Sequence, residues 1–226
     1  MIFILFSLFP PLREAEEFGF GDIRRLTGPS LSVTYQNLFS ISELQSVKIE
    51  WNRERYGLLL SHFGTELYRE MVFGGSYKLE LENLWLMIEP SLLYLSQKDE
   101  DNFGFNTNFM IGLFVKNYEI YLNAIHPISY ISGETIPAEM ELCMLYDNEW
   151  NRIGLKLDFL EGWGIGLGFG YLLKFTNFEV GVGLLTNPFI PTIGFSMDIG
   201  SIRFGAGFQN HTDLGLSRTF TVHYRR

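Results

Sequence analysis

Two histidines stand near hydroxyl and carboxylate side chains, a combination that hydrolytic chemistry could use. His211 begins the segment 211–213, which continues with a threonine and an aspartate, and His126 lies near Ser129 and Glu134. A hydrolase needs a nucleophile, a base and an orienting group within hydrogen-bond reach. Both histidines fall in segments that we expect to be loops, where a histidine beside hydroxyls is common. We therefore expect no catalytic residues and no enzymatic activity.

Metal and cofactor motifs are equally weak. The acidic run 98–102 could hold a calcium ion, but it lacks the spaced ligands and the fixed glycine of a known calcium loop. The G-x-G spacings in 162–170 alternate with large apolar residues and lead into another apparent strand. A dinucleotide fingerprint would instead open a helix. We expect no metal and no cofactor.

Charged and amide side chains recur at alternate positions of segments that are otherwise apolar. Successive side chains of a strand point to opposite faces, so these residues are predicted to face inward and line a lumen. The set comprises Lys48, Glu50, Lys78, Glu80, Glu89, Asn106, Asn108, Glu119, Glu139, Glu141, Lys156, Asp158, Glu179, Asp198 and Arg203. They could form a cation-leaning pore, or internal ion pairs that bridge and fill a narrow lumen.

The elements that must position these charges are amphipathic strands. Between 214 and 224, every second residue is apolar except Arg218, and the residues between them are small or polar. The segments 193–199 and 202–209 alternate in the same way. This period-two pattern, repeated along most of the chain, is typical of a transmembrane β-barrel with an apolar outer face and a polar lumen.

About 14 candidate strands follow one another, a number within the range of known barrels. They are 31–37, 46–52, 55–63, 67–81, 84–95, 103–116, 118–125, 138–146, 151–160, 163–175, 177–185, 191–199, 202–209 and 214–224. With the N-terminus in the periplasm, the even connections are tight turns and the longer connections, such as 96–102 and 126–137, are extracellular. The fold class predicted is therefore all-β, an antiparallel transmembrane barrel with periplasmic termini.

Composition bounds the possibilities. Aromatic residues make up 16 % of the 226 residues, and mean hydropathy is only +0.08. No apolar run approaches the roughly 20 residues that a membrane-spanning helix needs. The net charge of −9 argues against a nucleic-acid partner. The single cysteine, Cys143, excludes an intramolecular disulfide. We expect residues 1–17 to be a signal peptide or an apolar N-terminal segment, 18–30 a segment that could lie inside the barrel, and 31–226 the barrel.

Large aromatic residues fall near the predicted strand ends, where aromatic girdles meet lipid headgroups. They are Trp51, Trp85, Tyr118, Tyr146, Trp150 and Trp163. The main structural alternative is a soluble β-sandwich or lipocalin-like barrel, which would turn its apolar face inward. The Gly-, Ser- and Thr-rich opposite face looks more like a lumen than like a charged soluble surface.

The segment 56–78, YGLLLSHFGTELYREMVFGGSYK, resembles an early hairpin of the FadL/PorV-type outer-membrane proteins. Tyr68, Arg69 and Glu70 stand where that family has a Tyr-x-Glu element. The segment 19–21 and Asn37 occupy the places of the family's Gly-rich segment and Asn-Pro-Ala motif, with Leu-Phe in place of Pro-Ala. The chain thus resembles a short, degenerate member of this family, which implies a 14-stranded barrel.

The resemblance implies an outer-membrane protein that passes small hydrophobic solutes or serves as an accessory barrel in protein secretion. The partners expected are outer-membrane lipid, a hydrophobic small molecule or a secretion-machinery protein, and the location is the bacterial outer membrane. Two alternatives stay open at this point. One is a structural or adhesion barrel with a plugged lumen, and the other is a soluble β-rich ligand-binding module.

Overall fold

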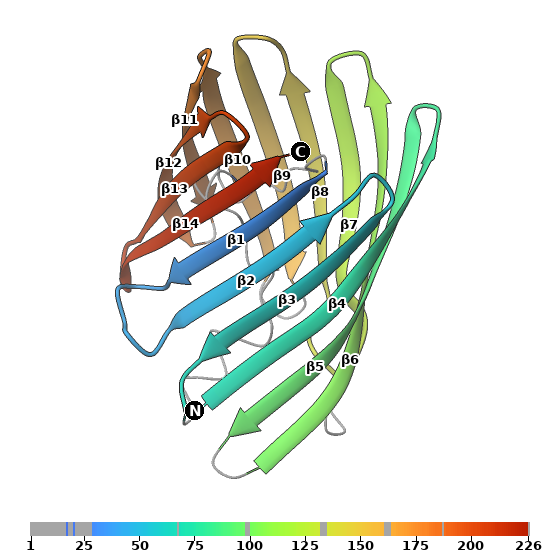
Figure 1. Cartoon of the computed structure of the whole chain (residues 1–226), viewed down its shortest axis with the longest axis vertical. Coiled ribbons are helices and arrows are strands. Elements are labelled where there is room, and N and C mark those ends of the chain that lie inside the picture. The colour runs from blue at the N-terminus through green and yellow to red at the C-terminus, as the bar shows by residue number, and fades with distance from the viewer. Residues whose placement is uncertain are drawn as a thin grey trace.

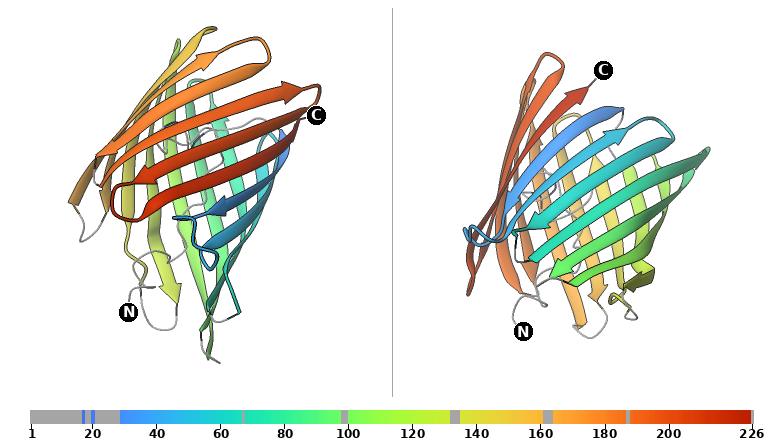
Figure 2. Two further views of the ribbon diagram at one scale, coloured as in Figure 1. Left: turned by 90° about the vertical axis from the view of Figure 1, so that its left-hand side faces the viewer. Right: turned by 60° about the horizontal axis from the view of Figure 1, so that its bottom comes forward.

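The computed structural model describes residues 17, 20, 29–66, 68–97, 100–131, 135–160, 164–186 and 188–225. Fourteen antiparallel strands form one closed barrel, in which each strand pairs with its neighbours in sequence and β1 pairs with β14 (Figures 1 and 2). The strands are β1 Ser30–Asn37, β2 Gln45–Asn52, β3 Tyr56–Gly64, β4 Tyr68–Leu81, β5 Leu84–Gln97, β6 Glu100–Val115, β7 Tyr118–Ile131, β8 Glu139–Asp147, β9 Asn151–Leu160, β10 Gly164–Lys174, β11 Phe178–Thr186, β12 Phe189–Ile199, β13 Ile202–His211 and β14 Gly215–Arg225. The predicted all-β, antiparallel barrel of about 14 strands is confirmed.

The seam between the first and last strands closes the barrel. Ser30 lies opposite Arg225, and the register runs without interruption to Asn37 opposite Arg218. Midway along the seam, the hydroxyl oxygens of Thr34 and Thr221 lie 3.1 Å apart inside the wall. A closed sheet leaves no strand edge with unpaired backbone groups, which is the condition that lipid imposes on a β-structure.

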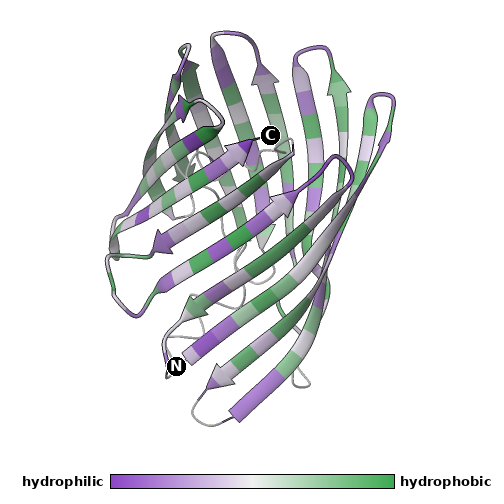
Figure 3. Ribbon diagram, in the orientation of Figure 1, coloured by the Kyte–Doolittle hydropathy of each residue, from purple (hydrophilic) through white to green (hydrophobic). Residues whose placement is uncertain are grey.

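The two faces of the wall are inverted relative to a soluble protein. On β1, Ser32 and Thr34 are 1 % and 0 % exposed, whereas Leu31 and Val33 are 43 % and 44 % exposed. Burial alternates in the same way along β12 and β14, and Figure 3 shows alternating hydrophobic and hydrophilic bands along the strands. The soluble alternative, which would turn the apolar face inward, does not describe this barrel. Among the described residues, no helix is long and apolar enough to cross a membrane.

The two ends of the barrel differ in their connections. Tight connections at 53–55, 82–83, 116–117, 148–150, 175–177 and 200–201 form the short-turn end, uppermost in Figure 1, where β14 also ends. The longest connections, 38–44 and 132–138, lie at the opposite, long-loop end. The predicted loop at 96–102 is wrong, because β5 extends to Gln97 and β6 begins at Glu100.

Strand β7 is the main departure from the expected boundaries, since it continues to Ile131 instead of ending at residue 125. A β-bulge shifts its register against β6 between Thr107 and Phe109, and His126 takes a left-handed φ of 56°. Ile125 and His126 are consequently both buried, which breaks the period-two pattern that the prediction relied on. A bulge also accommodates the proline that follows His126 within the strand.

Candidate functional site: the barrel interior

The predicted lumen residues lie on the polar face of the wall. Among them, Lys48, Asn106, Glu141, Lys156, Glu179 and Arg203 are buried, and Glu50, Glu89, Asn108, Glu119, Glu139, Asp158 and Asp198 are half-buried. Lys78 is also half-buried, while the side chain of Glu80 is 61 % exposed near the short-turn end and pairs with Lys78 at 2.6 Å. The side chains of this set thus lie on the face of the wall opposite the exposed apolar residues, from its middle to its rims.

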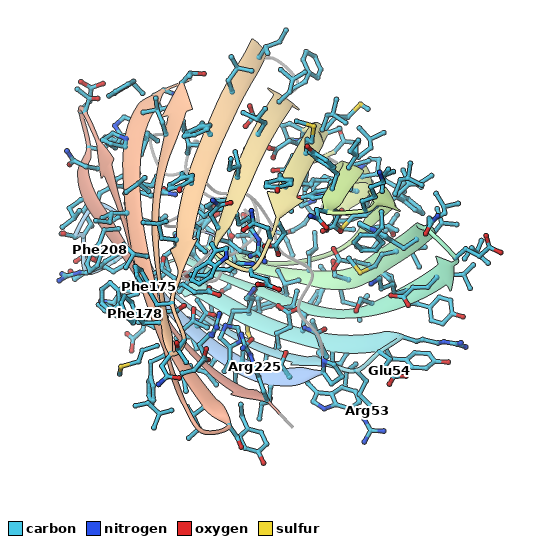
Figure 4. All side chains as sticks on the ribbon, turned by 90° about the horizontal axis from the view of Figure 1, so that it is seen from above. Arg53, Glu54, Phe175, Phe178, Phe208 and Arg225 are labelled. Atoms are coloured by element: carbon cyan, nitrogen blue, oxygen red, sulfur yellow. The ribbon has the colours of Figure 1, made fainter. Side chains whose placement is uncertain are left out.

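Arg203 organises one cluster of these charges on β11–β14. Its Nη1 donates to Glu179 Oε2 at 3.0 Å, and its Nε and Nη2 donate to the two oxygens of Asp198 at 2.7 and 2.5 Å. Arg225 adds a longer contact to Asp198 at 3.6 Å. Two hydrogen bonds from one guanidinium to one carboxylate hold both side chains in a fixed plane. Arg225 points to the inner side of the wall in the view of Figure 4.

A second cluster lies in the middle of β7–β9. Lys156 Nζ lies 3.5 Å from Glu141 Oε1 and 3.1 Å from Asp158 Oδ2. Asn123 Nδ2 donates to the other oxygen of Glu141 at 2.8 Å. Asn123, Glu141 and Asp158 lie in direct register on adjacent strands, and Lys156 lies two residues before Asp158 on β9, so the cluster follows the wall.

A third cluster at the short-turn end was missing from the predicted set. Asp147 at the end of β8 accepts hydrogen bonds from Arg152 of β9 and Lys174 of β10. Lys174 also donates to the carbonyl of Asn148 at 2.7 Å. Successive residues of a strand alternate between the inner and outer faces, and we call a residue's place in this alternation its parity. Parity alone would have placed all three charged residues inward, because they continue the alternation of β8, β9 and β10.

These ion pairs follow the wall rather than cross the lumen. In the described part of the chain, each recorded pair among inward side chains joins residues on one strand or on strands one or two places apart. None of these recorded pairs bridges opposite walls, and ion pairs across the lumen stay a prediction. Pairs along the wall neutralise one another without closing the space between opposite walls.

One sector of the inner wall is apolar. Trp85, Met87, Met110, Tyr121, Cys143, Leu145 and Leu172 form a buried cluster on β5–β8 and β10, which we call the apolar patch. Trp85 is 0 % exposed, so its assignment to the aromatic girdle is wrong. Its position on β5 has inward parity, and its indole lies over Gly112 of β6 so closely that a Cβ there would sit 2.3–2.5 Å from the ring.

Phe20 completes this cluster from the segment that precedes β1. Its side chain is 4 % exposed and belongs to the apolar patch, and a Cβ on Gly170 would lie 2.7 Å from its ring and 2.5 Å from its carbonyl oxygen. Its backbone N–H donates to the carbonyl of Glu17, which is also buried. Phe20 therefore occupies space inside the barrel. The rest of segments 1–17 and 18–30, up to residue 28, lies outside the described residues.

The contact between Phe20 and Gly170 gives a first prediction. A Gly170→Leu substitution places a side chain where Phe20 now packs, so we expect Phe20 to leave the inner wall and the channel conductance to change. Phe20→Ala should raise the single-channel conductance, because it removes a ring from the lumen. Conductance in a planar bilayer measures both. Equal conductance of the wild type and Phe20→Ala would contradict an obstructing position of Phe20.

The other predicted girdle residues are placed differently from Trp85. Trp51, Tyr118 and Trp150 are exposed, and Tyr118 and Tyr146 pack against each other with tilted rings whose centroids lie 5.1 Å apart. All four lie close to the short-turn end, at the termini of β2, β7 and β8 or in the following turn. Trp163 lies outside the described residues. A belt of amphipathic rings at a strand end is what a headgroup region favours.

At the long-loop end, the connection after β7 folds against the inner wall. Ile136 is buried with Leu93 and Ile131, and its backbone N–H donates to Ser129 Oγ at 3.0 Å while its carbonyl accepts from the same hydroxyl at 3.1 Å. On the neighbouring β4, the Tyr68 hydroxyl donates to Glu70, which is 2 % exposed. The apolar side chains around Ile136 and the polar Tyr68–Glu70 pair thus both occupy the inner face at the long-loop end of the barrel.

Among the described residues, neither histidine site assembles catalytic geometry. Ser129 is engaged with Ile136, and His126 lies in the β7 bulge, where its backbone N–H donates to Asn108 Oδ1 at 3.0 Å. His211 Nδ1 accepts the backbone N–H groups of residues 213 and 214, both at 3.2 Å, and so closes the turn between β13 and β14. Glu134 lies outside the described residues. Across the described ranges, no three His, Cys, Asp or Glu side chains gather as metal ligands.

Comparison with known proteins gives a fold but no family. No family model matches the sequence, and no curated protein matches it in sequence. The outer-membrane protein Omp33 of Acinetobacter baumannii is similar in structure, with a TM-score of 0.56 at 9 % identity, covering 87 % of this chain and 97 % of that chain. A mutant porin of Rh. blastica reaches a TM-score of 0.48 at 8 % identity, covering 87 % and 98 %. By its likeness to Omp33, this chain has the fold of an outer-membrane β-barrel protein.

Proposed function

We propose that this protein is a channel of the bacterial outer membrane that lets small solutes pass along its polar inner wall. One observation carries the proposal: the barrel is closed and is apolar outside and polar and charged inside. The apolar outer face of such a wall suits contact with lipid, and its polar inner face suits contact with water. The recorded ion pairs follow the wall and do not cross the lumen, which supports an open path between opposite walls.

The charge of the interior favours cations. Carboxylates outnumber cationic groups among the described side chains of the inner face. The carboxylates are Glu50, Glu70, Glu80, Glu89, Glu119, Glu139, Glu141, Asp147, Asp158, Glu179 and Asp198, and the cations are Lys48, Lys78, Arg152, Lys156, Lys174, Arg203 and Arg225. An excess of carboxylates in a pore raises the local concentration of cations.

Ion selectivity tests this proposal directly. With a KCl gradient across a planar bilayer that contains the purified protein, we expect a reversal potential of the sign for potassium permeation. The Glu89→Gln, Glu139→Gln double variant should shift the potential toward zero. Glu54→Gln, in a turn outside the lumen (Figure 4), should leave it unchanged. Chloride selectivity would refute the cation preference, and an absence of current from correctly folded protein would refute the channel.

A second candidate is passage of small hydrophobic solutes, as the resemblance to FadL/PorV-type proteins predicts. The apolar patch favours it, because an inner wall that served only hydrated ions would gain nothing from Trp85, Met87 and Met110. An accessory role in secretion stays a prediction from that resemblance. The position of Phe20 inside the barrel favours the plugged alternative, which silent bilayers would support.

A further inference from the structure

We propose that the apolar patch is a binding site for an apolar organic cation, a protonated amine with a hydrocarbon or aromatic body, which binds where Phe20 now packs. The inference deepens the proposed channel function and rests on it. It follows from three features of the same sector of the inner wall: what covers the patch, which polar atoms border it, and the sign of the nearest charge.

Phe20 shows what kind of group the patch accepts. Phe20 belongs to the segment before β1 and not to the strands that form the patch. Its side chain is nevertheless as buried as the strand residues around it. Apolar surface inside a water-filled barrel is unfavourable unless another apolar group covers it. A Phe ring is therefore the right size and chemistry for the site, and Gly170 leaves room for it.

The border of the patch carries two buried polar side chains, Trp85 and Glu119, that face each other. Neither Nε1 of Trp85 nor Oε1 of Glu119 makes a hydrogen bond of normal geometry within the described ranges, so each is at best loosely satisfied by the other. Glu119 lies on β7 directly opposite Leu145 of the patch. A buried polar atom without a partner is costly, and such atoms in native proteins often mark a place for a ligand or water.

The charge of Glu119 selects the sign of the ligand. Its carboxylate is attracted to Lys78 and Arg152, but each of these cations has a closer acidic partner. Lys78 pairs with Glu80 and lies over the Trp85 ring, 5.6 Å from its centroid, and Arg152 pairs with Asp147. An ammonium group at Oε1 of Glu119 would supply a charged donor to a carboxylate that otherwise faces only the neutral indole of Trp85 in poor geometry, whereas a carboxylate ligand there would meet a like charge.

Four probes separate the apolar and ionic parts of this site: hexylammonium, methylammonium, hexanoate and acetate, titrated calorimetrically into the full chain in lipid nanodiscs, with empty nanodiscs as the blank. We expect hexylammonium to bind about tenfold or more tightly than methylammonium, since each buried methylene contributes favourably. We also expect it to bind about tenfold or more tightly than hexanoate, since only the ammonium pairs with Glu119.

Two variants locate the site. Glu119→Gln should reduce hexylammonium binding about tenfold while it keeps the preference for the hexyl over the methyl chain, since a charged hydrogen bond becomes a neutral one. Glu54→Gln, at an exposed turn, should change nothing. Phe20→Ala should tighten hexylammonium binding, because it removes the group that occupies the patch, and this variant keeps the test valid if Glu119→Gln does not fold.

Equal binding of hexylammonium and hexanoate, or equal effects of Glu119→Gln and Glu54→Gln, would overturn the inference. Potassium current through the same preparation is measured in parallel. Current without discrimination among the four probes would leave the channel standing and remove the binding site. Discrimination among the four probes without current would leave the binding site standing and remove the channel.

Discussion

Replacement of Arg203 by Met should destabilise the barrel by about 3–5 kcal/mol, the range found when one partner of a buried ion pair is removed. The Arg203 side chain is 6 % exposed and faces Glu179 and Asp198, whose side chains are 10 % and 31 % exposed. Removing the guanidinium takes a 3.0 Å ion pair from Glu179 and a 2.5 Å ion pair from Asp198, so these contacts no longer offset the cost of holding both carboxylates away from bulk water. Equilibrium unfolding in urea, with the protein in lipid vesicles, measures the change.

Arg225→Met provides the matched control. Arg225 contacts the same Asp198, but at 3.6 Å and with a side chain that is 42 % exposed. An exposed pair contributes only about 0–1 kcal/mol. A loss for Arg203→Met no larger than that for Arg225→Met would show that the interior around β11–β14 is wet and that its ion pairs do not stabilise the wall.

Leu157→Arg should cost about 2–4 kcal/mol, the penalty for an arginine on the lipid face near the midplane of a barrel. Leu157 is 42 % exposed near the middle of β9, and it lies in register with Leu142 and Leu167 on the same face. In a protein surrounded by water, an exposed leucine would tolerate arginine within about 0.5 kcal/mol. Unfolding from lipid vesicles again provides the measurement.

The depth of the position is the internal control for this prediction. Leu81 is 50 % exposed but ends β4 at the short-turn end, where an arginine can reach the headgroups. Leu81→Arg should cost only about 0–1 kcal/mol. If the two substitutions were equally mild, the outer face would not be embedded in lipid at the depth that the alternation predicts.

Much of the fold could be predicted because the apolar residues repeat with the period of a strand. The alternation along β14 and β12 reads directly as an outer and an inner face, and the structure places those residues accordingly. The pattern failed at His126, where a bulge puts two consecutive residues on the inner side. A bulge is set by cross-strand geometry, here by Asn108 opposite it, and leaves no periodic trace in the sequence.

The interior was harder to predict, because residue type and strand parity disagreed there. Trp85 has the chemistry of a girdle residue but inward parity, and parity determined its position. In the third cluster, Arg152 and Lys174 lie within the predicted strands 151–160 and 163–175, but their partner Asp147 lies one residue beyond the predicted strand 138–146, so the sequence did not indicate the cluster. Segment 18–30 could be predicted as one that could lie inside the barrel, but the contact of Phe20 with Gly170 could not, since it depends on how the barrel closes.

Disulfide cross-linking across the β1–β14 seam tests the closed, membrane-embedded barrel most directly. In a Cys143→Ser background, Thr34→Cys with Thr221→Cys places two cysteines at partner positions of the seam, and Gly205→Cys with Thr221→Cys does the same within the β13–β14 hairpin. A closed barrel predicts that both pairs cross-link in protein from the outer-membrane fraction. Cross-linking of the hairpin pair alone, or recovery of the protein in the soluble fraction, would contradict it.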